Sequence, residues 1–336
     1  MLFLPLPHGT RPRRLSVAMT ALVGSAVTAW LTGIPAFAQA PAPGDILLNT
    51  FTDQNVLLYN PAGGLRNTYT DGATMAWEGA GLTPDGNIVT TFRLPDAGVK
   101  IFTPAGVQIG AFATPETLIA GDISVFADGV LAIADQQNQR VLLYSHSGTL
   151  LNTLSAPGAI DPFGNYVDPA TNTLWQANVN GNQIDHFTES GTLLGSFATT
   201  FRPSDLVVDP TDGTLWVSDR TNELVQHLSP LGVVLSNFDS GLVGTTGIGI
   251  SANGATLYVA GHASGVVNEF TRTGVSVGSF AIVGGDAATP LFLTVVPSAA
   301  APEPGTLALL GLAALPLAGL GLRRRDQGGG SFGKSA

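Results

Sequence analysis

The sequence predicts an all-β fold, a six-bladed β-propeller with four-stranded blades. One unit recurs six times, and its turn glycines are spaced by 43, 42, 43, 41 and 42 residues, at Gly63, Gly106, Gly148, Gly191, Gly232 and Gly274. A period of about 40–45 residues is typical of a four-stranded propeller blade. The 42 glycines and 22 prolines provide many turns, and 44% of the residues are hydrophobic, which is enough for a core. This composition favours many short strands over a long helical bundle.

Each unit is expected to contain strand, turn, strand, loop, strand, glycine turn and strand. The glycine supplies the positive φ that the last turn needs. An Asp-Gly turn or its equivalent comes before the hairpin, as at Asp85-Gly86 and Asp212-Gly213. A β-branched residue stands three positions before the first large hairpin residue and should face a neighbouring blade, at Val56, Val99, Val141, Ile184, Val225 and Val267.

The first and last units together predict how the ring closes. The first unit offers strands at 46–48, 56–59 and 65–69 but no innermost strand, while an additional strand at 291–296 follows the sixth unit. One C-terminal strand with three N-terminal strands would complete a blade and remove two open sheet edges. A seventh blade would need about 42 more residues than residues 45–297 offer.

Charge and cysteine content exclude several functions. The net charge of −10 argues against a nucleic-acid partner, which would require a basic surface. Seven of the 14 basic residues and two of the 24 acidic ones lie outside residues 45–297, so the propeller segment carries a net charge of −15. The absence of cysteine excludes disulfides, thiolate metal sites and a cysteine nucleophile.

The N-terminal 38 residues are expected to be a secretory signal peptide. Arg11, Arg13 and Arg14 precede an uncharged stretch over residues 15–34, and the small residues Ala36 and Ala38 then suit signal peptidase. Cleavage is expected after Ala38, which leaves residues 39–44 as a short linker before the propeller. An uncleaved membrane anchor is the alternative.

A second apolar segment lies near the C-terminus. Residues 306–322 are seventeen positions without a charge, followed at once by Arg323, Arg324 and Arg325. Seventeen residues is the lower limit for a membrane-spanning helix, and the arginines would stay on the cytoplasmic side. A buried core helix is the alternative, although the glycines and the proline of the segment disfavour a water-soluble helix. Residues 326–336 are expected to be a disordered tail.

Residues 298–325 carry three ordered parts: Pro302-Glu303-Pro304, a short glycine-containing apolar segment and the arginine cluster. This arrangement resembles the PEP-CTERM sorting signal of Gram-negative bacteria. The resemblance implies recognition by an exosortase, cleavage near the motif and release outside the cytoplasmic membrane, commonly in organisms that make exopolysaccharide. The tail beyond the arginines is longer than is usual for such signals.

One repeat, residues 203–219, resembles an NHL-type propeller unit, with Pro203-Ser204-Asp205 leading into Asp212-Gly213 and then Trp216. A looser match begins at Asp122. The resemblance is specific for the fold but says little about function, because such propellers include protein binders, carbohydrate binders, lyases and lactonases.

The starts of the innermost strands are where a propeller would place a site at its channel mouth. Counting back from the turns gives the candidates Glu78, Asp122, Asn165, Asp205 and Thr246. Carboxylates and an amide on one rim could bind Ca²⁺ through oxygen. In residue type this resembles the metal site of gluconolactonase-like propellers. The alternative interpretation is that these residues cap strand starts and bond to neighbouring segments.

Other polar residues are interpreted structurally. His186 and His227 occupy equivalent, partly exposed strand positions without metal-ligand spacing, and no Gly-x-Ser-x-Gly elbow, phosphate loop or serine triad is present. Asp135, Asn178 and Asp219 should brace the loop after the second strand. Trp175 and Trp216 should be core residues, whereas Trp77 is expected near the rim, where it could stack on a sugar ring.

These observations predict an exported binding or scaffolding protein of the cell envelope or exopolysaccharide matrix, with no assigned catalytic residue. Its expected partners are signal peptidase and an exosortase during export, and an envelope or polysaccharide ligand afterwards. It would be anchored in the cytoplasmic membrane through the C-terminal helix and then processed. The alternative is a metal-dependent, lactonase-like hydrolase or lyase that works at the channel mouth.

Overall fold

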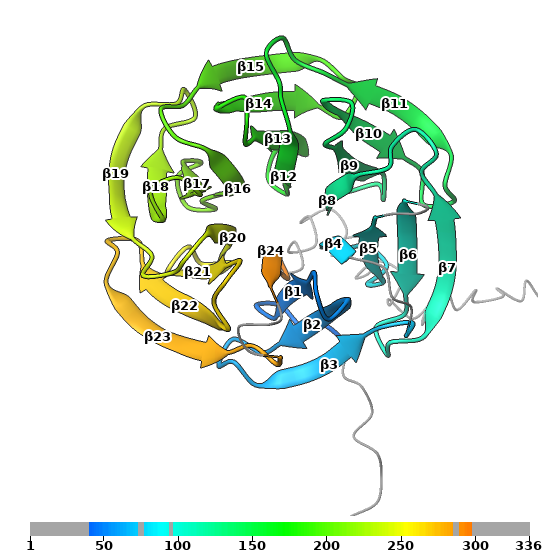
Figure 1. Cartoon of the computed structure of the whole chain (residues 1–336), viewed down its shortest axis with the longest axis horizontal. Helices are drawn as coiled ribbons and strands as arrows, with labels where there is room; N and C mark the ends of the chain where they lie inside the picture. The colour runs from blue at the N-terminus through cyan, green and yellow to red at the C-terminus, as the bar shows by residue number, and fades with distance from the viewer. Residues whose placement is uncertain (1–39, 73–76, 94–96, 285–288, 298–336) are drawn as a thin grey trace, which may run out of the picture. The chain divides into compact units, whose positions relative to one another are not determined.

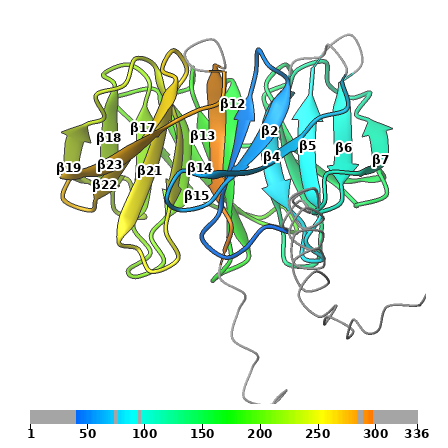
Figure 2. The same cartoon turned by 90° about the horizontal axis from the view of Figure 1, so that it is seen from below.

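A computed structural model describes residues 40–72, 77–93, 97–284 and 289–297. These residues form 24 strands, β1 to β24, which pair into six four-stranded sheets. The sheets stand as blades around one axis (Figure 1). Seen from the side, their strands run between the two ends of the ring (Figure 2). The predicted six-bladed propeller with four-stranded blades is therefore confirmed.

The blades are numbered along the chain, and each is given from its innermost to its outermost strand. Blade 1 contains β24 (Pro290–Val295), β1 (Ile46–Thr50), β2 (Asn55–Tyr59) and β3 (Leu65–Tyr69). Blade 2 contains β4 (Trp77–Leu82), β5 (Ile88–Phe92), β6 (Gly98–Phe102) and β7 (Gln108–Ala113). Blade 3 contains β8 (Ala120–Val125), β9 (Leu131–Asp135), β10 (Arg140–Tyr144) and β11 (Leu150–Leu154).

The second half of the ring follows the same order. Blade 4 contains β12 (Pro162–Asp168), β13 (Thr173–Asn178), β14 (Gln183–Thr188) and β15 (Leu193–Ala198). Blade 5 contains β16 (Pro203–Val208), β17 (Leu215–Asp219), β18 (Leu224–Leu228) and β19 (Val234–Asp239). Blade 6 contains β20 (Thr245–Ile250), β21 (Thr256–Gly261), β22 (Val266–Thr271) and β23 (Ser276–Ala281).

Blade 1 closes the ring as the sequence predicts. Strand β24 pairs antiparallel with β1, so that Leu293 lies opposite Leu48. Beyond the strands, the backbone N–H of Val296 donates to Asp45 O at 2.7 Å. One C-terminal and three N-terminal strands therefore form one sheet, and the two ends of the propeller segment are held together by a ladder of hydrogen bonds.

The blades pack on one another through buried side chains. All six predicted β-branched residues are at most 2% exposed. Trp175 and Trp216 are buried, as predicted, and stack on the partly exposed rings of His186 and His227 with centroid distances of 3.8 and 3.9 Å. Each tryptophan therefore separates its histidine from the core.

The terminal segments predicted from the sequence lie outside the residues that the structure describes. The chain divides into one compact unit over Met1–Pro297 and a second over Ser298–Ala336. The expected signal peptide at 1–38, the sorting segment at 298–325 and the tail at 326–336 lie outside the described residues. Among the described residues, no helix has the length and apolar character needed to cross a membrane.

Candidate site at the strand-start mouth

One end of the ring is formed where the innermost strands begin and the second strands end, and we call it the strand-start mouth. In blades 1, 3, 4, 5 and 6 the residue after the second strand donates its backbone N–H to the segment that leads into the innermost strand, as Arg220 does to Arg202 O at 3.0 Å. Pairing within the blades makes this rim position equivalent in all six, at Phe51, Arg93, Gln136, Val179, Arg220 and His262.

The predicted site residues all lie in innermost strands, and each is at most 4% exposed. They do not share one level. Strand pairing aligns Asp122 with Asp205, and Glu78 with Thr246, whereas Asn165 lies one position further along its strand. The structure therefore places the candidates at three successive levels of the innermost strands rather than in one ring.

At the strand position of the two aspartates, glycine and aspartate alternate from blade 2 to blade 5. Blades 2 and 4 have glycine where blades 3 and 5 have Asp122 and Asp205. A Cβ atom at Gly79 would lie 2.5 Å from Asp122 Oδ1, and one at Gly164 would lie 2.6 Å from Asp205 Oδ1. Each carboxyl group thus fills the space that the missing side chain of the preceding blade leaves.

These carboxyl groups accept backbone hydrogen bonds from the next blade. Asp122 Oδ2 accepts from the N–H of Asn165 at 3.1 Å, and Asp205 Oδ2 accepts from the N–H of Ile248 at 3.0 Å. Innermost strands have an edge without a neighbouring strand, and buried N–H groups on such an edge need an acceptor. This geometry matches the interpretation that the residues cap strands and join blades.

The candidate calcium ligands already have partners within the protein. Both oxygens of Asp122 and of Asp205 already accept backbone N–H groups, and Glu78 forms an ion pair with Arg93. The described part of the chain holds no group of three or more His, Cys, Asp or Glu side chains placed to bind a metal ion. The donor set as it stands does not fit Ca²⁺, and the hypothesis stays a prediction for metal analysis.

Burial changes the titration of these acids. Desolvation raises the pKa of Asp122 to about 8, against the lowering effect of its backbone hydrogen bonds. It also raises the pKa of Asp205 well above the ordinary value, and the charge of Asp122 adds to that rise. Burial likewise raises the pKa of Glu78 to about 8, although Arg93 opposes this. The two aspartates therefore favour the protonated acid in the folded protein, whereas Glu78 keeps its ion pair with Arg93.

A second group of side chains, which the sequence did not single out, occupies the mouth itself. The guanidinium of Arg220 lies 5.5 Å from the ring centroid of Phe163, and that of Arg93 lies 5.7 Å from Phe51. Arg202 donates to Asn180 Oδ1 at 2.7 Å, and Asn180 donates to Asp161 Oδ2 at 2.7 Å. The mouth therefore carries three arginines from blades 2 and 5.

An aromatic floor lies beneath these arginines. Phe163 on β12 and Phe292 on β24 have ring centroids only 4.7 Å apart. These strands belong to blades 4 and 1, which face each other across the ring (Figure 1). The two rings therefore meet near the axis, and together with Val179 and Leu291 they form a buried apolar cluster.

Trp77 is not available at the rim. Its side chain is fully buried, with the ring centroid 5.7 Å from that of Phe102 and 5.1 Å from Lys100 Nζ. The prediction that Trp77 could stack on a sugar is wrong, because its ring packs into the core cluster that contains residues of blades 1 and 2.

The predicted bracing role of the repeat acids is confirmed for both aspartates. Asp219 Oδ1 accepts from the backbone N–H of Thr221 at 2.9 Å, and Asp135 Oδ1 accepts from that of Asn138 at 3.1 Å. Asn178 differs, because its amide donates to Asp185 Oδ2 at 2.8 Å. The rim position comes directly after these bracing residues, so reading one residue further along each repeat would have located Arg220.

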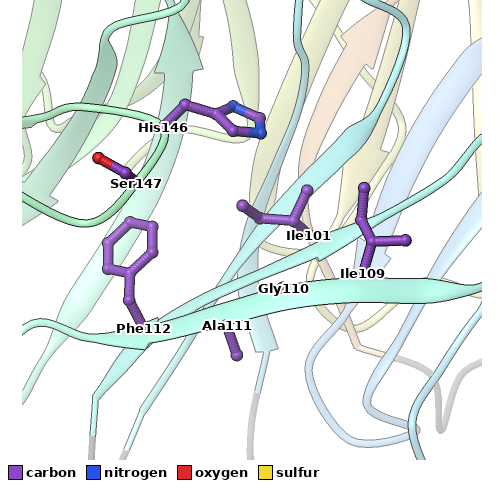
Figure 3. Close-up of a pocket in the computed structure, with 7 residues that line it drawn as sticks. All are labelled: Ile101, Ile109, Gly110, Ala111, Phe112, His146 and Ser147. Carbon is purple, nitrogen blue, oxygen red and sulfur yellow. The ribbon is translucent and has the colours of Figure 1, made fainter.

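A separate cavity of about 250 Å³ lies on the outer side of the ring, between blades 2 and 3. Figure 3 shows its lining, and no charged side chain is among the residues Ile101, Ile109, Gly110, Ala111, Phe112, His146 and Ser147. It is remote from the channel axis and lacks the convergent polar groups that fix the orientation of a ligand. The strand-start mouth is therefore the stronger candidate site.

Several solved structures share the fold of this chain at low sequence identity. A protein of unknown function from Bacteroides caccae is 13% identical, with a TM-score of 0.60, over 75% of this chain and 98% of that one. The nidogen/laminin complex contains a chain that is 14% identical, with a TM-score of 0.62, over 76% and 99%. Virginiamycin B lyase from Staphylococcus aureus is 16% identical, with a TM-score of 0.51, over 74% and 77%. At such identities the likeness establishes the fold alone.

Comparison by sequence identifies the C-terminal segment. No curated protein matches the chain. The PEP-CTERM protein-sorting motif matches residues 300–325, which include Pro302-Glu303-Pro304 and the arginine cluster. This motif marks a protein that is directed to an exosortase for export. The chain is thus similar to other exosortase-sorted proteins in its C-terminal signal, which it joins to a six-bladed β-propeller.

Proposed function

We propose that this protein is an exported binding module of the cell envelope or exopolysaccharide matrix, and that it holds its ligand at the strand-start mouth. The observation that carries the proposal is the group of three arginines above the aromatic floor at the end of a ring that is otherwise strongly acidic. The sorting motif supports the location, because it directs the propeller out of the cytoplasm.

The chemistry of the mouth suits binding more than turnover. Arg220 and Arg93 each rest on an aromatic ring, and a stacked guanidinium keeps its planar set of N–H donors in a fixed orientation. Residues from at least four blades reach the mouth, so a ligand would be held from several sides. Rigid, convergent donors of this kind lower the entropy cost of association.

Binding to material from the producing cells tests the proposal. The exported protein should sediment with isolated extracellular polysaccharide, and Arg220→Gln should release a large share of it. Arg272→Gln is the matched control, since Arg272 of blade 6 pairs with Asp209, which follows the end of β16 in blade 5, away from the mouth. Retention of Arg220→Gln at the level of the unchanged protein would place the binding surface elsewhere.

The enzyme alternative rests on the buried acids, because a carboxyl group with a pKa near 8 can exchange a proton at neutral pH. If it is correct, the purified protein contains stoichiometric metal and has lactonase or lyase turnover that Glu78→Gln abolishes. Metal content at background level, together with no turnover, would exclude this alternative.

A further inference from the structure

We propose that the ligand of the strand-start mouth is a carboxylated sugar, the uronate unit of an acidic polysaccharide, bound by Arg202 and Arg220 of blade 5. The inference rests on the proposed function and names the class of ligand. It is carried by three features of the described part of the mouth: two cations without an ion pair, a half-buried guanidinium without hydrogen bonds, and unpartnered polar atoms on neighbouring blades.

The first feature concerns charge. Five of the seven basic residues of the propeller segment form ion pairs, namely Arg66, Arg93, Lys100, Arg140 and Arg272. Arg202 and Arg220 form none with a described carboxylate. They lie side by side, and both burial and the charge of Arg202 lower the pKa of Arg220. Two adjacent like charges leave a positive site that an incoming anion would stabilise.

The second feature is the state of Arg220. The side chain is half-buried, and its guanidinium rests on Phe163. None of the N–H groups of the guanidinium donates a hydrogen bond to a side chain or carbonyl of the described residues, although a guanidinium carries five donors. Half-buried donors without partners are unusual in a native protein. A carboxylate fits them, because its two oxygens match the fork of N–H groups.

The third feature points to a sugar rather than to a small anion. Nε2 of Gln136 and Nδ1 of His262 are buried without a hydrogen-bond partner, and both residues occupy the same rim position as Arg220. Burial and Arg220 lower the pKa of His262, which keeps its ring neutral and able to donate or accept. Both side chains are only half-buried, so a rotation of either would turn its unpartnered nitrogen toward the mouth, where the several hydroxyl groups of a sugar could bond to it.

Few of the described acidic side chains at the mouth are placed to neutralise Arg202 and Arg220. The acids that act on Arg220 are Asp161 and Glu78. Asp161 accepts a hydrogen bond from the amide of Asn180. Glu78 is already paired with Arg93, and burial raises the pKa of Glu78 to about 8. Neither acid forms an ion pair with Arg202 or Arg220 within the described structure, so the two arginines remain available to an external carboxylate.

Calorimetric titration with trigalacturonate, with neutral galactotriose as the matched control, tests the inference on the exported protein. Trigalacturonate should bind and the neutral sugar should not. Arg220→Gln and the exposed Arg202→Gln should each weaken binding by about 10-fold or more, the usual effect of losing a hydrogen bond between charged groups. Arg272→Gln should change it by less than about 2-fold. Thermal unfolding verifies that each variant is folded.

The outcomes separate the two proposals. Equal binding of both sugars, unaffected by Arg202→Gln, would overturn the uronate inference and leave a binding function in place. Sulfate that binds as tightly as trigalacturonate would reveal a general anion site and also overturn it. If neither these sugars nor polysaccharide from the producing cells binds, the proposed function itself is wrong.

Discussion

At the scale of single residues, the six turn glycines have two physical reasons to be glycine. All have a positive φ, between 78° and 96°. Several are also covered by an aromatic ring of the preceding blade: a Cβ atom at Gly232 would lie 2.3 Å from Phe197 Cδ2. The sequence pattern indicated the first reason, but only the packing of neighbouring blades reveals the second.

Gly232→Ala should therefore lower the free energy of unfolding by about 1–3 kcal/mol, through backbone strain and displacement of Phe197. Gly195→Ala is the control, since no atom lies within 4 Å of the added Cβ and its φ is not positive. We expect the control to change stability by less than about 0.5 kcal/mol in urea unfolding. Equal effects of the two substitutions would contradict this explanation.

The buried acids make stability depend on pH. The folded pKa of Asp122 is raised to about 8 from an ordinary 3.8, so the folded state keeps a proton that the unfolded state loses. The stabilisation is complete below about pH 4 and disappears as the pH rises through about 8, because the folded state binds more protons in that window. Glu78 acts in the same direction.

Asp122→Asn should flatten this dependence, since the amide stays neutral. Urea unfolding at pH 5, 7 and 9 should show the free energy of unfolding falling less steeply with pH than in the unchanged protein. The exposed Asp85, whose pKa is lowered by its hydrogen bond from Thr83, provides the control Asp85→Asn, which should leave the slope unchanged. A slope unaffected by Asp122→Asn would show that Asp122 is ionised in the folded protein.

At the scale of strands, counting along the sequence found the innermost strands but not their register. The last paired residues before and after the first turn enclose five residues in blade 3, between Val125 and Leu131, but six in blade 5, between Val208 and Leu215. A bulge near the start of each innermost strand shifts the pairing again. Counting back from the turn therefore placed Asn165 at a different level from the aspartates.

The closing strand should contribute strongly to stability. Leu293 on β24 is 4% exposed and packs among residues of blades 1 and 6. Leu293→Ala should lower the free energy of unfolding by about 2–5 kcal/mol, as is usual for a large-to-small core substitution. Leu194→Ala, on the exposed face of β15, is the control and should change it by less than about 0.5 kcal/mol. A small effect at Leu293 would mean that β24 is not required for closure.

At the scale of the whole molecule, the chain joins an acidic ring to a sorting signal. We expect the exported form to lack the segment after the Pro302-Glu303-Pro304 motif, because exosortase substrates are cut near it. Replacing the three arginines 323–325 with glutamine should leave the uncut protein in the membrane fraction. Mass spectrometry of the native protein measures this, and a C-terminus that still ends at Ala336 in the exported form would contradict processing.

The sequence alone determined the repeat, the number of blades, the way the ring closes and the sorting motif. These properties depend on spacing and local turn chemistry, which are visible along the chain. The tertiary structure decided the site, because Phe163 and Phe292 are far apart in the sequence and meet only when opposite blades converge. For the same reason, no spacing rule could show that Arg202 and Arg220 form no ion pair with a described carboxylate or that the ring of Trp77 turns into the core.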